Sequence, residues 1–167
     1  MTEQVRATVA QKIETAFSDT VYPGDGNICH DPYQGVQEDF RGKHWKDLSL
    51  NLIIRHRDKI PSLTPEAFHF YLPAFMNAVL FHYDEVDTLP INVMTGLTPP
   101  THESQDRWPM NNLMHGFLRN VEGFSVQERI AILAFLESYS QLVPEQIAVG
   151  ELKLLDRAIA YWKSEYK

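Results

Sequence analysis

Cysteine and long apolar runs are the two features that this sequence most clearly lacks. The single cysteine, Cys29, cannot form an internal disulfide, so the sequence favours a reducing compartment. No run approaches the roughly 18 apolar residues that a membrane-spanning helix requires. The first residues include acids and have no apolar centre of signal-peptide length. These absences predict a cytoplasmic protein that is neither exported nor embedded in a membrane.

Recognisable catalytic and cofactor motifs are also missing. The sequence has no phosphate-binding glycine loop, no nucleophile elbow and no zinc-ligand spacing. Cys29 and His30 are adjacent, and adjacent side chains rarely face each other as a nucleophile and its base must. The missing motifs weigh against an enzyme, and the sequence predicts no catalytic residue and no cofactor.

Positive charge is absent from one long block of the chain. Residues 61–106 contain six acidic residues and no lysine or arginine, within a protein of net charge -7. Such a block is unsuited to nucleic acid and would suit a basic partner better. A buried helix in the same block would also keep charges of either sign rare, and this alternative stays open.

The densest apolar stretch, residues 63–83, is predicted to form the buried central helix. Thr64 is the expected N-cap and Pro65 occupies the first helical position. Pro73 lacks an N–H group, so we expect a kink there with the proline on the convex, exposed side. A narrow stripe is predicted to face outward with it, formed by Glu66, His69, Pro73 and Asn77.

The rest of the chain predicts a mainly α protein, with residues 1–167 forming a single compact domain of about six helices around the proline-kinked helix. Helical patterns occur at 3–17, 35–40, 49–59 and 110–123, and two more begin at Ser125 and Pro144. Long irregular loops are expected at 20–34 and 84–109. The first is interpreted as a cap anchored by Tyr22 and Ile28. The second is a candidate partner surface, with at most a brief strand near residues 91–94.

Glu66 and His69 are three residues apart on one helical face, as two ligands of a metal site could be. This spacing is half of the carboxylate-bridged di-iron pattern, and the second half has no match in the sequence. The sequence therefore predicts no metal ligand. A metal-dependent hydrolase using Glu66 and His69, with Asp25 as a further ligand, is kept as an alternative.

Four motifs together resemble a known family. They are AF followed by YPGD, then FRGKHW, LTPEAFHFYLPAFMNAVL and LLDRAIAYW. Over residues 13–162 the chain is similar to an uncharacterised family of small bacterial proteins, a domain of unknown function with YPGD, FxGKxW and LTPEAFxFYLPAF signatures. The resemblance implies a bacterial, cytoplasmic and mainly helical domain, and it carries no catalytic residues.

The function expected from these observations is protein binding. Small size, acidic balance and absent catalytic motifs favour an immunity protein that neutralises a cognate bacterial toxin, the partner being a basic toxin domain rather than nucleic acid or a membrane. An acidic rim around an aromatic anchor is the predicted contact surface. Its residues are Asp84, Glu85, Asp87, Glu103, Asp106 and Trp108. A regulatory adaptor is a further alternative.

Overall fold

A computed structural model describes residues 1–30, 35–101, 110–143 and 148–164. These residues form eight α-helices and two short 3-10 helices, and they contain no strand, only an isolated bridge between Cys29 and Leu63. The predicted mainly helical fold is confirmed. None of these helices is long and apolar enough to cross a membrane. The elements are α1 (Glu3–Ala16), α2 (Val36–Phe40), η2 (Trp45–Asp47), α3 (Leu50–Arg55), η3 (Arg57–Ser62), α4 (Pro65–His82), α5 (Leu89–Gly96), α6 (Met110–Val121), α7 (Val126–Tyr139) and α8 (Ala148–Ser164).

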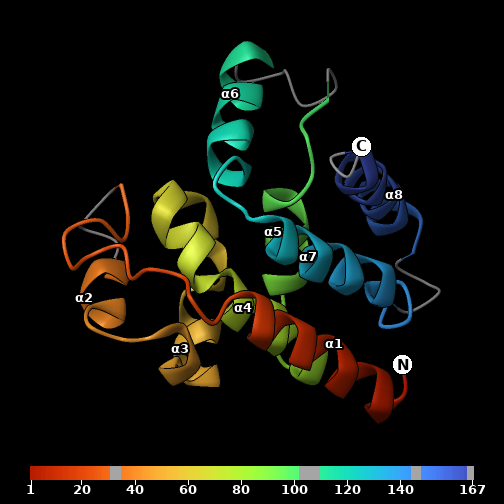
Figure 1. Ribbon diagram of the computed structural model, residues 1–167, viewed down its shortest axis with the longest axis horizontal. Coiled ribbons are helices and arrows are strands. Elements are labelled where there is room, and N and C mark those ends of the chain that lie inside the picture. Colours follow the sequence, from red (N-terminus) through yellow and green to blue (C-terminus); the bar gives the residue numbers. More distant parts are fainter. Residues whose placement is uncertain (31–34, 102–109, 144–147, 165–167) are drawn as a thin grey trace.

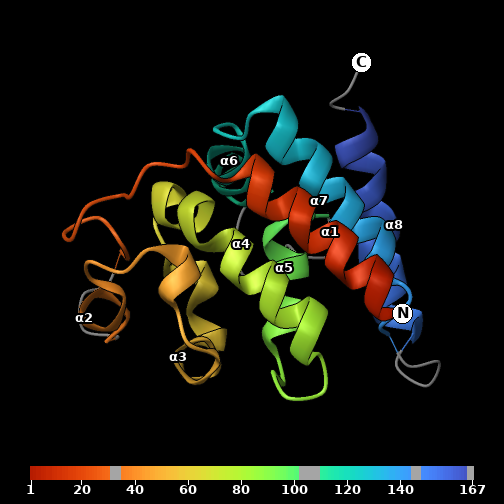
Figure 2. The same ribbon diagram turned by 60° about the horizontal axis from the view of Figure 1, so that its bottom comes forward.

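Helix α4 is the centre of the fold. Its N-terminus is capped as predicted, because the Thr64 hydroxyl accepts a hydrogen bond from the Ala67 amide at 3.1 Å and Pro65 begins the first turn. Helices α1, α3, α5 and α6 and the 3-10 helix η2 all contact it. Figure 1 shows α2 and α3 on one side of α4, with α7 and α8 on the other. Figure 2 shows α1 lying beside α7.

The crowding around α4 overturns one prediction. Pro73 is buried, so the expectation that it lies on an exposed convex side is wrong. Between Ala67 and Leu80 every residue except His69 and Asn77 is buried. A proline can occupy such a position because its ring is apolar and it has no N–H group to leave unpaired. The predicted stripe is therefore not one outward face, and Glu66 is its only exposed member.

The predicted irregular loop at 84–109 is also corrected, because it contains helix α5. Pro90 lies in the first turn of α5, where its missing N–H group costs nothing. Leu89, Val93 and Met94 are buried and share the helical face that packs inward. The residues expected to form a brief strand belong to this helix. Pro90 thus marks the start of a helix and does not indicate a continuous loop.

The loop at residues 20–30 is irregular, as predicted, and it is firmly attached to the start of α4. Ile28 is fully buried, and its carbonyl accepts a hydrogen bond from the Thr64 amide at 3.1 Å. The Tyr22 ring packs edge-on against Phe70, and its hydroxyl accepts a hydrogen bond from the Gly42 amide at 2.8 Å. Both predicted anchors are therefore in place, and residues 31–34 lie outside the described part.

Two glycines provide a test of how tightly α5 packs. An alanine Cβ at Gly96 would lie 3.0 Å from the Phe68 ring, whereas one at Gly116 of α6 would meet no atom within 4 Å. Gly116→Ala should stabilise the protein by about 0.5–1 kcal/mol through helix propensity. Gly96→Ala should destabilise it by roughly 1 kcal/mol, because overpacking outweighs the same gain. Urea unfolding of both variants measures the difference, and equal stabilisation would contradict the close packing.

Candidate functional site

The first candidate surface is the acidic turn, which consists of Asp84, Glu85 and Asp87 between α4 and α5. All three side chains are exposed. The turn continues from α4 through backbone hydrogen bonds to the His82 carbonyl, donated by Glu85 at 2.8 Å and by Val86 at 3.2 Å. Val86 is fully buried and fixes the turn to the core. The acidic side chains therefore project from a segment whose backbone is held in place.

The three carboxylates of the acidic turn differ in their partners. Asp87 Oδ2 lies 2.9 Å from Arg57 Nη2, which neutralises its charge. Glu85 Oε1 lies 2.9 Å from His82 Nδ1. Among the described residues, no lysine or arginine forms an ion pair with Asp84 or Glu85. Within the acidic turn, Asp84 and Glu85 are thus the members whose negative charge is open to a basic partner.

The aromatic anchor beside this turn is a residue that the sequence prediction did not include. The predicted site residues Glu103, Asp106 and Trp108 lie outside the described residues. Phe81, in the last turn of α4, exposes 43% of its surface. The available signal was the helical spacing, since Phe81 follows Asn77 by four residues and continues the stripe that starts at Glu66.

The second candidate site is a groove formed by α1, α4, α7 and residues 18–21, here called the His69 groove. It has a volume of about 1060 Å³, and Glu66, His69 and Glu128 are among its lining residues. His69 Nε2 lies 2.7 Å from Glu128 Oε1, and its side chain is 27% exposed. The rings of Phe17 and Phe124 pack edge-on against the imidazole. The imidazole is therefore held in a fixed orientation.

Glu128 is the buried partner that fixes His69. Only 4% of Glu128 is exposed. Its Oε2 accepts a hydrogen bond from the Ser125 amide at 2.7 Å, while the Ser125 hydroxyl accepts one from the Glu128 amide, which confirms the capping box at the start of α7. Burial alone would raise the pKa of the Glu128 carboxyl, but the contacts with His69 and Ser125 outweigh it and lower the pKa. The pair joins α4 to α7 with an ionised carboxylate.

The residues of the alternative metal site are not brought together. The described residues contain no group of three or more His, Cys, Asp or Glu side chains that could hold a metal ion. Glu66 Oε2 instead accepts a hydrogen bond from the Asn27 amide group at 3.4 Å. Asp25 accepts one from the Tyr22 hydroxyl at 2.7 Å. Partial burial and this contact with Asp25 raise the pKa of Tyr22.

Comparison with known proteins adds one finding. No curated protein and no solved structure matches the chain. The sequence model of one protein family, described as a family of unknown function (DUF6714), matches residues 5–166. This span contains the YPGD motif, the FRGKHW motif and the whole of α4. The predicted membership of an uncharacterised domain family is confirmed, and the chain belongs to the family of unknown function DUF6714.

Proposed function

We propose that the protein binds a basic protein partner at the acidic turn, as an immunity protein does when it covers the active site of a toxin. The observation that carries this proposal is the position of an exposed aromatic ring, Phe81 in the last turn of α4, four residues before Glu85 of the acidic turn. Asp84 lies between them, and no described lysine or arginine pairs with either carboxylate. An apolar anchor thus adjoins two available negative charges.

Each part of this surface has a distinct physical role. Carboxylates at the rim of an interface attract a basic partner over a distance and mainly raise the association rate. A large aromatic side chain that becomes buried on binding mainly slows dissociation. Phe81 is exposed in a helix whose other large side chains are almost all buried. A binding role would account for that exposure, which contributes nothing to the core.

The first test is whether a toxin-domain gene is encoded next to the gene for this protein, and the product of such a gene is the partner to use in binding measurements. Asp84→Lys combined with Glu85→Lys should lower the association rate by roughly tenfold at low salt, because the steering charge is reversed. The dependence of that rate on salt should weaken at the same time. Surface plasmon resonance measures both rates, and growth of cells that co-express the toxin reports neutralisation.

The matched control is Glu122→Lys combined with Asp156→Lys, which makes the same change in net charge at two exposed positions elsewhere. This control should keep its association rate and its protection of growth. A third variant, Phe81→Ala, should act mainly on the dissociation rate. Equal loss in the control would show that only net charge matters, and an unchanged rate in the turn variant would reject this surface.

A further inference from the structure

A second, smaller groove lies between α1, η2, α3 and α4 and is here called the Trp45 groove. Its volume is about 450 Å³, within the range of sites that bind small molecules. Its walls include alanines from α1 and α4, and because alanine ends at Cβ these side chains leave the space between the two helices unfilled. These alanines are Ala7 and Ala10 of α1, and Ala74 and Ala78 of α4.

Two residues that line this groove each carry a buried polar atom without a hydrogen-bond partner. The two atoms are Trp45 Nε1, a donor, and Asn77 Oδ1, an acceptor. Among the described residues, the other buried side-chain atoms in this condition are Nε atoms of arginines, whose remaining N–H groups can be satisfied separately. An unpaired buried polar atom is rare and costly. A donor and an acceptor left unpaired along one groove therefore point to a ligand.

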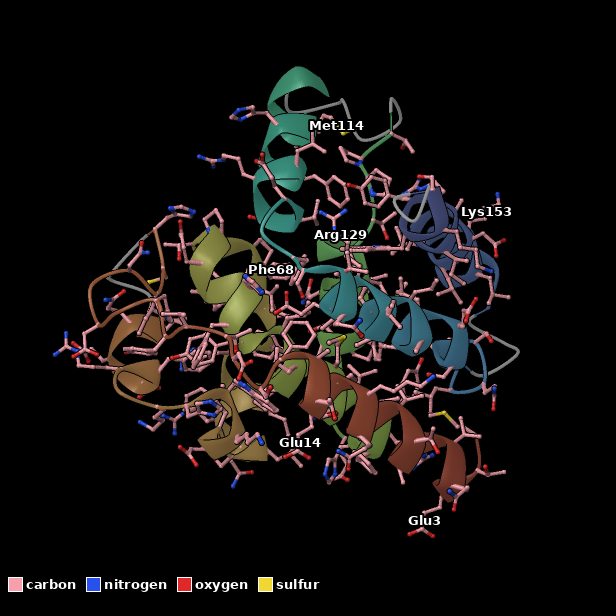
Figure 3. The ribbon with its side chains drawn as sticks, in the orientation of Figure 1. Glu3, Glu14, Phe68, Met114, Arg129 and Lys153 are labelled. Carbon is pink, nitrogen blue, oxygen red and sulfur yellow. The ribbon has the colours of Figure 1, made fainter. Side chains whose placement is uncertain are left out.

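The rim of the groove carries one charge of each sign. Glu14 of α1, labelled in Figure 3, forms an ion pair with Lys46 of η2. The Lys46 ammonium also lies 5.2 Å from the centre of the Trp45 ring. Both charged side chains are about half exposed, and an ion pair of this kind contributes little stability. The pair can therefore open at small cost and offer its two charges to a ligand.

We propose that the Trp45 groove binds a free amino acid with a side-chain carboxamide, glutamine or asparagine. A carboxamide has a carbonyl that accepts from Trp45 Nε1 and an NH₂ group that donates to Asn77 Oδ1. The α-ammonium then pairs with Glu14 and the α-carboxylate with Lys46. Because both unpaired atoms are shielded from water, binding includes a small rotation of the Trp45 and Asn77 side chains. Phe81 also lines this groove, so the site adjoins the proposed partner surface. The four ligand contacts use none of Phe81, Asp84 and Glu85, so the two proposals can fail separately.

Isothermal titration calorimetry of the full-length protein with L-glutamine and with L-asparagine tests the proposal. We expect one of the two to bind at one site per chain. L-glutamate and L-aspartate should bind at least tenfold more weakly, because a carboxylate cannot donate to Asn77 Oδ1. Trp45→Phe and Asn77→Leu should each weaken binding by tenfold or more. In a ¹H–¹⁵N spectrum of the wild type, the Trp45 indole N–H resonance should shift on addition of the bound amide.

A blocking variant separates loss of binding from loss of folding. Ala10 is only partly buried and lines the groove, so Ala10→Phe should fill the groove without disturbing the core and abolish binding. Ala160→Phe, on the exposed surface of α8, is the matched control and should bind normally. Acids that bind as tightly as amides would overturn the proposed ligand class. Absence of saturable binding by either amide at millimolar concentration would overturn the site.

Discussion

Replacing Trp162 by alanine should lower the free energy of unfolding by about 4–5 kcal/mol, which is the upper range for truncation of a buried aromatic residue. Trp162 is completely buried in α8, and its Nε1 donates a hydrogen bond to the Leu97 carbonyl at 2.8 Å. Its ring packs edge-on against Phe124, between α6 and α7, at 5.8 Å. The substitution removes the ring that joins these elements and leaves a buried carbonyl without its donor.

This loss is large compared with the roughly 5–15 kcal/mol by which domains are stable. Urea unfolding followed by circular dichroism measures the loss. Trp162→Phe, which keeps an aromatic ring but removes the donor to Leu97, should fall between the wild type and the alanine variant. Lys163→Ala on the same helix removes only a surface ion pair with Glu137 and should change stability by less than about 0.5 kcal/mol. A similar small change for Trp162→Ala would contradict the role of the tryptophan.

Features set by neighbouring residues could be predicted from the sequence. The N-cap at Thr64 and the capping box of Ser125 and Glu128 depend on hydrogen bonds that span three residues, so the residue types alone identify the helix starts. Helix α5 is harder to recognise, because a proline in its first turn and two more shortly after its end obscure its short apolar pattern. What stabilises α5 is burial of Leu89 and Val93 against distant elements, and that burial is not encoded locally.

The error at Pro73 has a similar origin. Helical spacing correctly groups Glu66, His69, Pro73 and Asn77 as neighbours, but spacing does not say how many elements surround a helix. Because α4 is packed on several sides, the same stripe passes from exposed Glu66 to buried Pro73. Periodicity is a reliable guide to the exposed face only when a helix has one covered side.

The candidate surfaces show the same division between local and distant information. Exposure of Asp84, Glu85 and Asp87 was predictable because acidic residues cluster in a turn. The pairing of Asp87 with Arg57 and of His69 with Glu128 was not, because each pair joins residues far apart in the chain. Both pairs change how the surface is interpreted. The ion pair with Arg57 neutralises Asp87, so Asp87 offers no free negative charge to a partner. The contact with Glu128 gives His69 a structural role, which is to hold α4 against α7.

The His69 and Glu128 pair leads to the second large expected effect. Glu128→Ala should lower the free energy of unfolding by roughly 2–4 kcal/mol. It removes the half of the capping box in which the carboxylate accepts from the Ser125 amide, and it removes a charged, buried hydrogen bond to His69 worth about 1.5–3 kcal/mol. Glu128→Gln should cost less, since glutamine can keep the capping box while losing the charge. Glu137→Ala, an exposed position on the same helix, should change stability by less than about 0.5 kcal/mol.

The pH dependence of these variants separates the charge of Glu128 from its packing. Because folding lowers the pKa of this carboxyl, its contribution is complete above the unfolded value of about 4.3 and is lost as the pH falls through the lower folded pKa. The stability gap between the wild type and Glu128→Ala should therefore be widest near neutral pH and should shrink at strongly acidic pH. Urea unfolding across this range measures the gap for both Glu128 variants. A gap that stays constant at every pH would mean that Glu128 stabilises α7 through its shape and packing alone, without the charged contact to His69.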